Sequence, residues 1–148
     1  MLMLARRGVR TQLLTNSTLN HATTGVNNQW FWQMARGREG VDYTVPYGIM
    51  EQNAGGRDRA SAVQQGDIRL LVKVVGKLTS SFSENNLATL AQEIEVALDE
   101  THASWSYRMN DEGFIWCSEI IQDVYYTELD GEVEYVHVGG IYRIRISK

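Results

Sequence analysis

Cysteine, proline and long apolar runs are nearly missing from this chain of 148 residues. A single cysteine, Cys117, cannot form a disulfide within the chain, which excludes the secreted folds that disulfides hold together. No apolar run approaches the roughly 18 residues of a membrane-spanning helix. The first apolar residues precede Arg6 and Arg7, the reverse of a secretory signal. With 43% hydrophobic residues, one domain over residues 1–148, of cytoplasmic origin and without a membrane partner, is expected.

Catalytic and metal-binding patterns are also missing. His21, His102 and His137 stand far apart, without the spacing of a histidine metal site. The glycine pair at 55–56 lacks the Lys-Ser/Thr of a phosphate-binding loop. The acidic residues of 123–134 do not follow the calcium-loop pattern, and a solvated hairpin explains them better. We therefore expect no enzyme, no cofactor and no metal site.

Basic residues are almost absent from residues 84–134, which contain 13 of the 18 acidic residues and only Arg108, a net charge of −12. Residues 1–83 contain ten basic and five acidic residues, a net charge of +5, and the whole chain carries −4. Segregated charge favours head-to-tail contact between copies; the alternative is that the acidic residues only solvate a helix and a hairpin. The acidic balance argues against nucleic-acid binding as a main activity.

Apolar periodicity predicts a helix over residues 2–15 and a second over residues 84–100, with Ser83 as its N-cap. Alternating residues predict strands at 44–52, 67–77, 104–108, 114–127 and 135–146. Adjacent Ile120 and Ile121 indicate a bulge or burial on both faces, and Asp130-Gly131 indicates a hairpin turn. The order helix, strand, strand, helix, strands predicts an α+β fold, an antiparallel or mixed sheet covered on one face by helices.

Two segments do not follow either period. Trp30-Phe31-Trp32 places three large rings in a row, so at least one ring is buried in an unusual way or offered to a partner. Residues 53–66 are rich in glycine and polar side chains and are predicted to form a long loop that orders on assembly. Contacts with other subunits are expected from this loop and from the acidic side of the second helix. The expected contact residues are Arg57, Arg59, Glu93, Glu95, Asp99 and Glu100.

The chain resembles the tail terminator (tail completion) proteins of long-tailed bacteriophages over about residues 44–146, whereas residues 1–43 match poorly. The resemblance begins with Val45-Pro46-Tyr47, the polar loop and the strand at 68–75. It continues with Leu-Ala-Thr-Leu-Ala-Gln-Glu-Ile in the helix at 86–98 and with Asp-Val-Tyr-Tyr at 123–126. It ends with Gly-Gly-Ile-Tyr-Arg-Ile-Arg-Ile at 139–146. No single one of these motifs is diagnostic, and the resemblance rests on their order and spacing.

The resemblance implies a small α+β protein that forms a hexameric ring. Such a ring caps the tail tube, ends tail elongation and offers a surface for head–tail joining. The implied partners are further copies of the chain, the tail tube protein and a head-completion or connector protein. The implied location is the tail or neck of a virion assembled in the host cytoplasm. Another neck, connector or tail-tube subunit and a small enzyme of unrecognised type are the alternatives.

Arg143 and Arg145 have the parity opposite to Tyr142, Ile144 and Ile146. If the second set packs under the helices, both guanidinium groups emerge on the other face of the sheet. In a ring through which DNA passes, that face would line the channel and make transient, non-specific phosphate contacts. The alternative is that both arginines pair with acidic groups of adjacent strands, such as Glu119 and Asp123.

Overall fold

The computed structural model describes residues 2–33, 39–58, 65–79, 83–99, 110–111 and 114–147. Its elements are α1 (Leu2–Leu14), β1 (Trp30–Trp32), β2 (Tyr47–Asp58), β3 (Gln65–Lys77), α2 (Glu84–Leu98), β4 (Asn110–Asp111), β5 (Phe114–Asp130) and β6 (Val133–Ser147). The order confirms the predicted helices and most strands. The strand predicted at 104–108 lies outside the described residues, as do Arg59 and Glu100.

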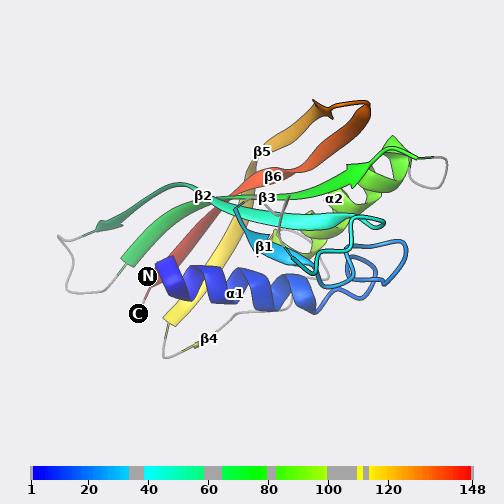
Figure 1. Ribbon diagram of the computed structural model, residues 1–148. Helices are drawn as coiled ribbons and strands as arrows, with labels where there is room; N and C mark the ends of the chain where they lie inside the picture. The colour runs from blue at the N-terminus through cyan, green and yellow to red at the C-terminus, as the bar shows by residue number, and fades with distance from the viewer. Residues whose placement is uncertain are drawn as a thin grey trace.

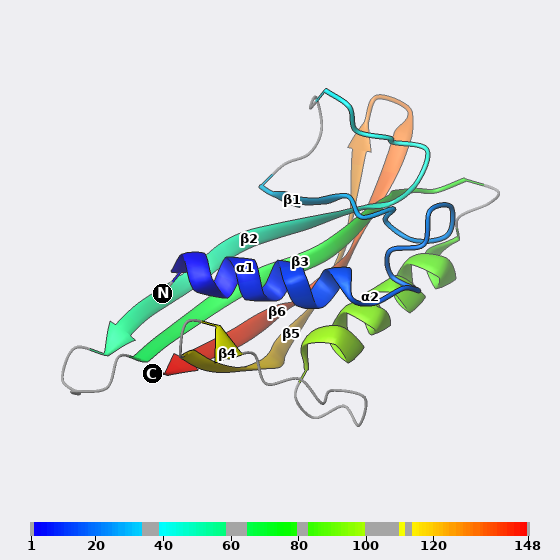
Figure 2. The same cartoon turned by 90° about the horizontal axis from the view of Figure 1, so that it is seen from below.

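The six strands form one sheet in the order β1-β2-β3-β6-β5-β4. β1 is parallel to β2, and every other neighbouring pair is antiparallel, so the sheet is mixed. Both helices lie across the same face of this twisted sheet, and the β2–β3 and β5–β6 hairpins project from opposite ends (Figures 1 and 2). The predicted α+β class with helices on one face is therefore confirmed.

Side-chain alternation decides which face of the sheet is buried. Leu70 and Val72 of β3 and Tyr142 and Ile144 of β6 are fully buried under the helices. The same period-3.6 stripe that predicted α2 supplies the cover. Its buried residues are Leu87, Leu90, Ile94, Ala97 and Leu98. The hydrophobic core therefore lies between the helices and one face of the sheet.

Local sequence signals mark the start of α2, the bulge in β5 and the turn between β5 and β6. The Ser83 hydroxyl accepts a hydrogen bond from the Asn86 N–H at 3.4 Å, which confirms the predicted N-cap. The β5–β6 register shifts between Ile120 and Gln122, so the predicted bulge is present and Ile121 is exposed. The β5–β6 turn contains Gly131 at φ 65°, a left-handed conformation that glycine adopts without strain.

The loop predicted at residues 53–66 is wrong for most of its length. β2 and β3 pair from Tyr47↔Val75 out to Asp58↔Gln65, so only residues 59–64 are left outside the described strands. The side chains there lack alternation, but an antiparallel ladder is made by backbone groups and tolerates glycine and polar residues near a sheet edge. The register shifts once, between Gln52 and Ala54, and the two strands remain paired on both sides of this shift. Arg57 thus lies on a strand, not in a loop.

The three adjacent rings of β1 divide between the two faces of the sheet. Trp30 is buried in the main core, and its indole N–H donates to the Asn20 side-chain oxygen at 2.9 Å. Phe31 packs in a second apolar cluster on the opposite face. Trp32 is half-buried, with the Arg6 guanidinium 4.6 Å from its ring centre. The core interpretation is therefore confirmed for Trp30.

Candidate interaction surfaces

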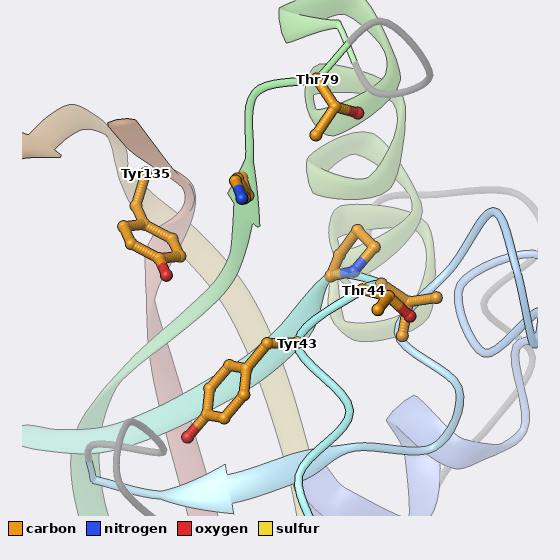
Figure 3. Close-up of a pocket in the computed structure, with 7 residues that line it drawn as sticks. Tyr43, Thr44, Thr79 and Tyr135 are labelled. Atoms are coloured by element: carbon orange, nitrogen blue, oxygen red, sulfur yellow. The ribbon is translucent and has the colours of Figure 1, made fainter. Parts of the chain in front are cut away.

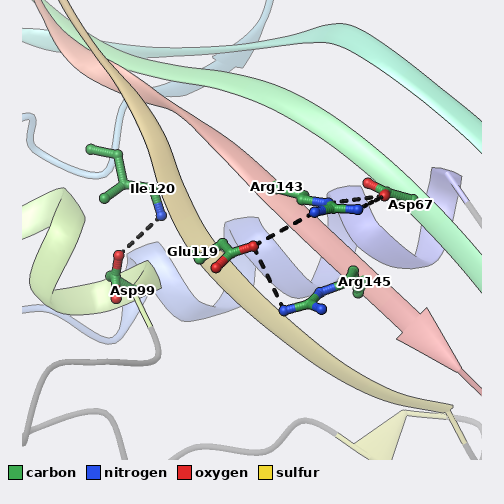
Figure 4. A network of polar contacts seen from close by, with 6 residues as sticks. All are labelled: Asp67, Asp99, Glu119, Ile120, Arg143 and Arg145. Atoms are coloured by element: carbon green, nitrogen blue, oxygen red, sulfur yellow. Dashed lines mark hydrogen bonds and ion pairs between the residues drawn. The ribbon is translucent and has the colours of Figure 1, made fainter.

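The sheet face opposite the helices carries a row of charged side chains. Odd-numbered residues of β3 and β6 point to this face, because even-numbered residues of both strands are buried under the helices. Asp67 of β3, Arg143 and Arg145 of β6 and Glu119 of β5 form a continuous row across three strands (Figure 4). No helix among the described residues covers it. We call this side the open face.

Ion pairs hold this row together. The Arg143 guanidinium donates to Oδ2 of Asp67 from Nε at 2.9 Å and from Nη2 at 2.5 Å, and it lies 4.0 Å from Glu119. The Arg145 guanidinium lies 3.6 Å from the same glutamate. The hydrogen bonds from Arg143 hold the pKa of Asp67 below its usual value. The alternative that both arginines pair with acidic groups of neighbouring strands therefore holds for Glu119, whereas Asp123 lies opposite Gly140, farther along.

Breaking the Asp67–Arg143 pair is expected to cost little at neutral pH. Both side chains are more than one third exposed, so a double-mutant cycle of Asp67→Asn and Arg143→Gln should give a coupling energy of about 1 kcal/mol or less. Because the folded-state pKa of Asp67 is lowered, this contribution is present above the unfolded pKa of about 4 and is lost as the pH falls through the folded value. Urea unfolding at several pH values measures it.

Glu132→Gln, a change at an exposed position in the β5–β6 turn, serves as the control for this cycle. It should leave the acid dependence unchanged. A coupling energy that stays constant between pH 7 and pH 2 would contradict the assignment of the pair.

A second polar group on the open face bridges β3, β6 and β5. The Lys73 ammonium donates to the Tyr126 hydroxyl at 2.6 Å, and the Tyr126 ring stacks on His137 with centroids 4.3 Å apart. The His137 Nε2 lies 2.9 Å from Oε2 of Glu128. Lys73 and His137 are buried, so the group fixes the three strands in register. Sequence reasoning treated the histidine as isolated. The Asp130-Gly131 signal, taken as the two loop residues, would pair Tyr126 with Tyr135. The actual loop is Gly131-Glu132, and this register places Tyr126 opposite His137.

A hollow of about 410 Å³ lies where β2 begins and β3 ends. Figure 3 shows Tyr135 on one side and Thr44 on the other, with Thr79 above and Tyr43 below. The remaining lining residues are Val45, Pro46 and Lys77. Two tyrosine rings, four hydroxyls and one ammonium thus line the hollow. Within the described residues, no three His, Cys, Asp or Glu side chains are close enough to hold a metal ion.

The acidic side of α2 differs from the prediction. Asp99 is 4% exposed, and its Oδ2 accepts the Ile120 N–H at 3.0 Å (Figure 4), so its expected role as a partner contact is wrong. The Glu93 carboxylate accepts from the Asn16 side chain at 2.8 Å, which ties α2 to the segment after α1. Glu95 is half-buried. The side chain of Arg57 and all of Arg59 and Glu100 lie outside the described part of the chain, so their roles stay predictions.

Comparison with known proteins bears on the fold. No family model and no curated protein matches the chain. A solved chain that carries no functional name is 14% identical with a TM-score of 0.56, and the alignment covers 100% of this chain and 96% of the other. A chain from the virion of a native gene transfer agent particle is 12% identical with a TM-score of 0.52, over 95% of this chain and 92% of the other. This chain therefore shares its whole fold, across nearly its full length, with a chain of that virion.

No described helix is both long and apolar enough to span a bilayer.

Proposed function

We propose that this chain is a structural protein of a phage-type virion, a tail terminator that assembles as a ring on the end of the tail tube. The ring would end tail elongation and offer its outer side to a head-completion or connector protein. The observation that carries the proposal is the fold shared with a chain of the gene transfer agent virion over 95% of this chain. The order of motifs at residues 44–146, which resembles tail terminators, supports the finer assignment.

The open face fits the lining of a channel for DNA. Arg143 and Arg145 are paired with Asp67 and Glu119 within the same row, and exposed Arg69, opposite Arg143 on this face, adds one positive charge. A strongly basic lining would hold the phosphate backbone, because each neutralised phosphate adds affinity through counterion release. A row in which two of the three arginines are paired with carboxylates offers short-lived contacts instead and allows DNA to move past.

Tail length measured by electron microscopy tests the proposal. Tails assembled without this protein should be longer than normal and irregular in length, and no heads should be joined to them. Supplying the purified protein to tubes of correct length should place one ring at a tube end and restore joining. Tails of normal length without heads would indicate a connector instead, complete loss of tails would indicate a tube subunit, and either result would overturn the proposal.

A further inference from the structure

Exposed apolar residues gather on one strand. The large hydrophobic side chains that are exposed among the described residues are Ile121, Tyr125, Tyr126 and Leu129, from 42% to 74% exposed, and all four belong to β5. Ile121 is the bulged residue and the other three lie beyond it, in the part of β5 that projects with β6 from one end of the sheet (Figure 1). There the Tyr125 hydroxyl donates a hydrogen bond to Glu84 at the start of α2. We call residues 121–137 the distal hairpin. Clustered exposed apolar residues on an otherwise polar surface mark a site for a partner.

The backbone of the distal hairpin also has one open edge. β5 pairs with β6 along one side, and on its other side β4 pairs with only Phe114 and Ile115. Residues 122–130 have no strand partner on that side among the described residues. An exposed edge of this length normally carries charges that prevent unspecific pairing. The distal hairpin contains five acidic residues and no lysine or arginine.

A surface of opposite character lies at the other edge of the sheet. β1 is the edge strand there, separated from β5 by β2, β3 and β6, which corresponds to about 19 Å at the usual strand spacing. Trp32 of β1 carries the Arg6 guanidinium over its ring. α1 contains Arg6, Arg7 and Arg10 and no acidic residue, and Arg10 is exposed. We call this surface the α1–β1 edge.

We propose that the distal hairpin of one copy docks on the α1–β1 edge of the next copy. This rests on the proposed function, because a ring needs one contact repeated between every two neighbours. The two surfaces lie on opposite edges of the same sheet, so a copy that is bound through one surface can still bind a further copy through the other. The same contact therefore repeats from copy to copy until a ring closes. Asp123 and Glu134, which lie on the helix side of the distal hairpin, then face the arginines of α1, which steers association and fixes the register.

The apolar side chains support the same orientation. Tyr125 pairs with buried Val138, so Tyr125 and Leu129 point to the helix side of the sheet. Trp32 packs against the main core and therefore lies on the helix side as well. A neighbour approaching edge to edge brings these three side chains together. Tyrosine, tryptophan and arginine are the residues that contribute most to binding at protein interfaces.

Two variants with one altered surface each provide the test. The hairpin variant combines Tyr125→Ser with Leu129→Ser, and the edge variant combines Arg7→Glu with Arg10→Glu. The wild-type protein at low salt should form concentration-dependent oligomers by sedimentation velocity, and added salt should weaken them, since ionic strength screens charged surfaces. Each variant alone should be monomeric. An equimolar mixture should form dimers and stop there, because one intact hairpin meets one intact edge.

A control variant changes Gln92→Lys on the outer side of α2, an exposed position about two turns beyond Glu84, the α2 residue that contacts Tyr125. It should assemble as the wild type does, and circular dichroism should show native folding for all variants. A monomeric wild type, oligomers of either single-surface variant, or a monomeric mixture would overturn the proposal. If the hairpin variant still ends tails at the correct length, this docking is wrong while the proposed function stands.

Discussion

Replacing Gly139 by alanine is expected to lower the free energy of unfolding by about 3 kcal/mol, the upper part of the range for an overpacked core. A Cβ at Gly139 would overlap the Val72 carbonyl oxygen and lie 2.5 Å from Cα of Lys73. Both atoms belong to the backbone of β3, which pairs with β6 at this position, so neither can move without separating the two central strands. Urea unfolding followed by circular dichroism measures the loss.

Gly76→Ala is the matched control. A Cβ there would meet the end of the Leu87 side chain, which can change rotamer. The expected cost is about 1 kcal/mol, at the lower end of the range for overpacking. Equal losses for the two variants would contradict the close approach of β3 and β6 as the reason for glycine at residue 139.

Asp99→Ala is expected to destabilise the fold by about 2 kcal/mol. The buried carboxylate accepts the Ile120 N–H at 3.0 Å, next to the bulge in β5, and its removal leaves that N–H without an acceptor. A negative charge at the C-terminal end of a helix is unfavourable for the helix dipole, so the residue is kept for the contact and not for the helix. Thermal or urea unfolding measures the change.

Asp99→Asn separates the hydrogen bond from the charge. The amide oxygen can accept the same N–H, so most of the stability should be retained. Glu95→Gln, a change of the same kind one turn earlier on α2, should have little effect. A loss in Asp99→Asn as large as in Asp99→Ala would show that the carboxylate charge, not the acceptor, stabilises this junction.

The sequence was informative wherever one face of an element is buried. The alternation of Tyr142, Ile144 and Ile146 placed β6 and its exposed arginines on the correct faces, because a strand has a strict period of two residues. The stripe from Leu87 to Leu98 did the same for α2. These patterns arise from burial itself, which acts on each position separately.

Contacts between residues of different elements could not be predicted from the sequence pattern, because they depend on how the chain places those elements side by side. Asp99 was placed on the outer side of a helix, but at this residue the backbone leaves the helix with ψ 122°, so the helical period no longer gives its direction. The Asp67–Arg143 pair depends on the register between β3 and β6, which no local pattern encodes. The outer part of the β2–β3 hairpin was missed because its backbone ladder needs no apolar side chain.

The position of β6 has a consequence for how the protein is made. β6 is the last of the six strands in chain order, yet it lies between β3 and β5 in the middle of the sheet. Until it leaves the ribosome, β3 and β5 have no central partner, and the apolar side of α2 lacks its largest contact in the sheet. Folding must therefore wait for the synthesis of β6, and it depends on contacts distant in sequence, which form slowly. A nascent chain therefore cannot complete its central sheet before this strand has been made.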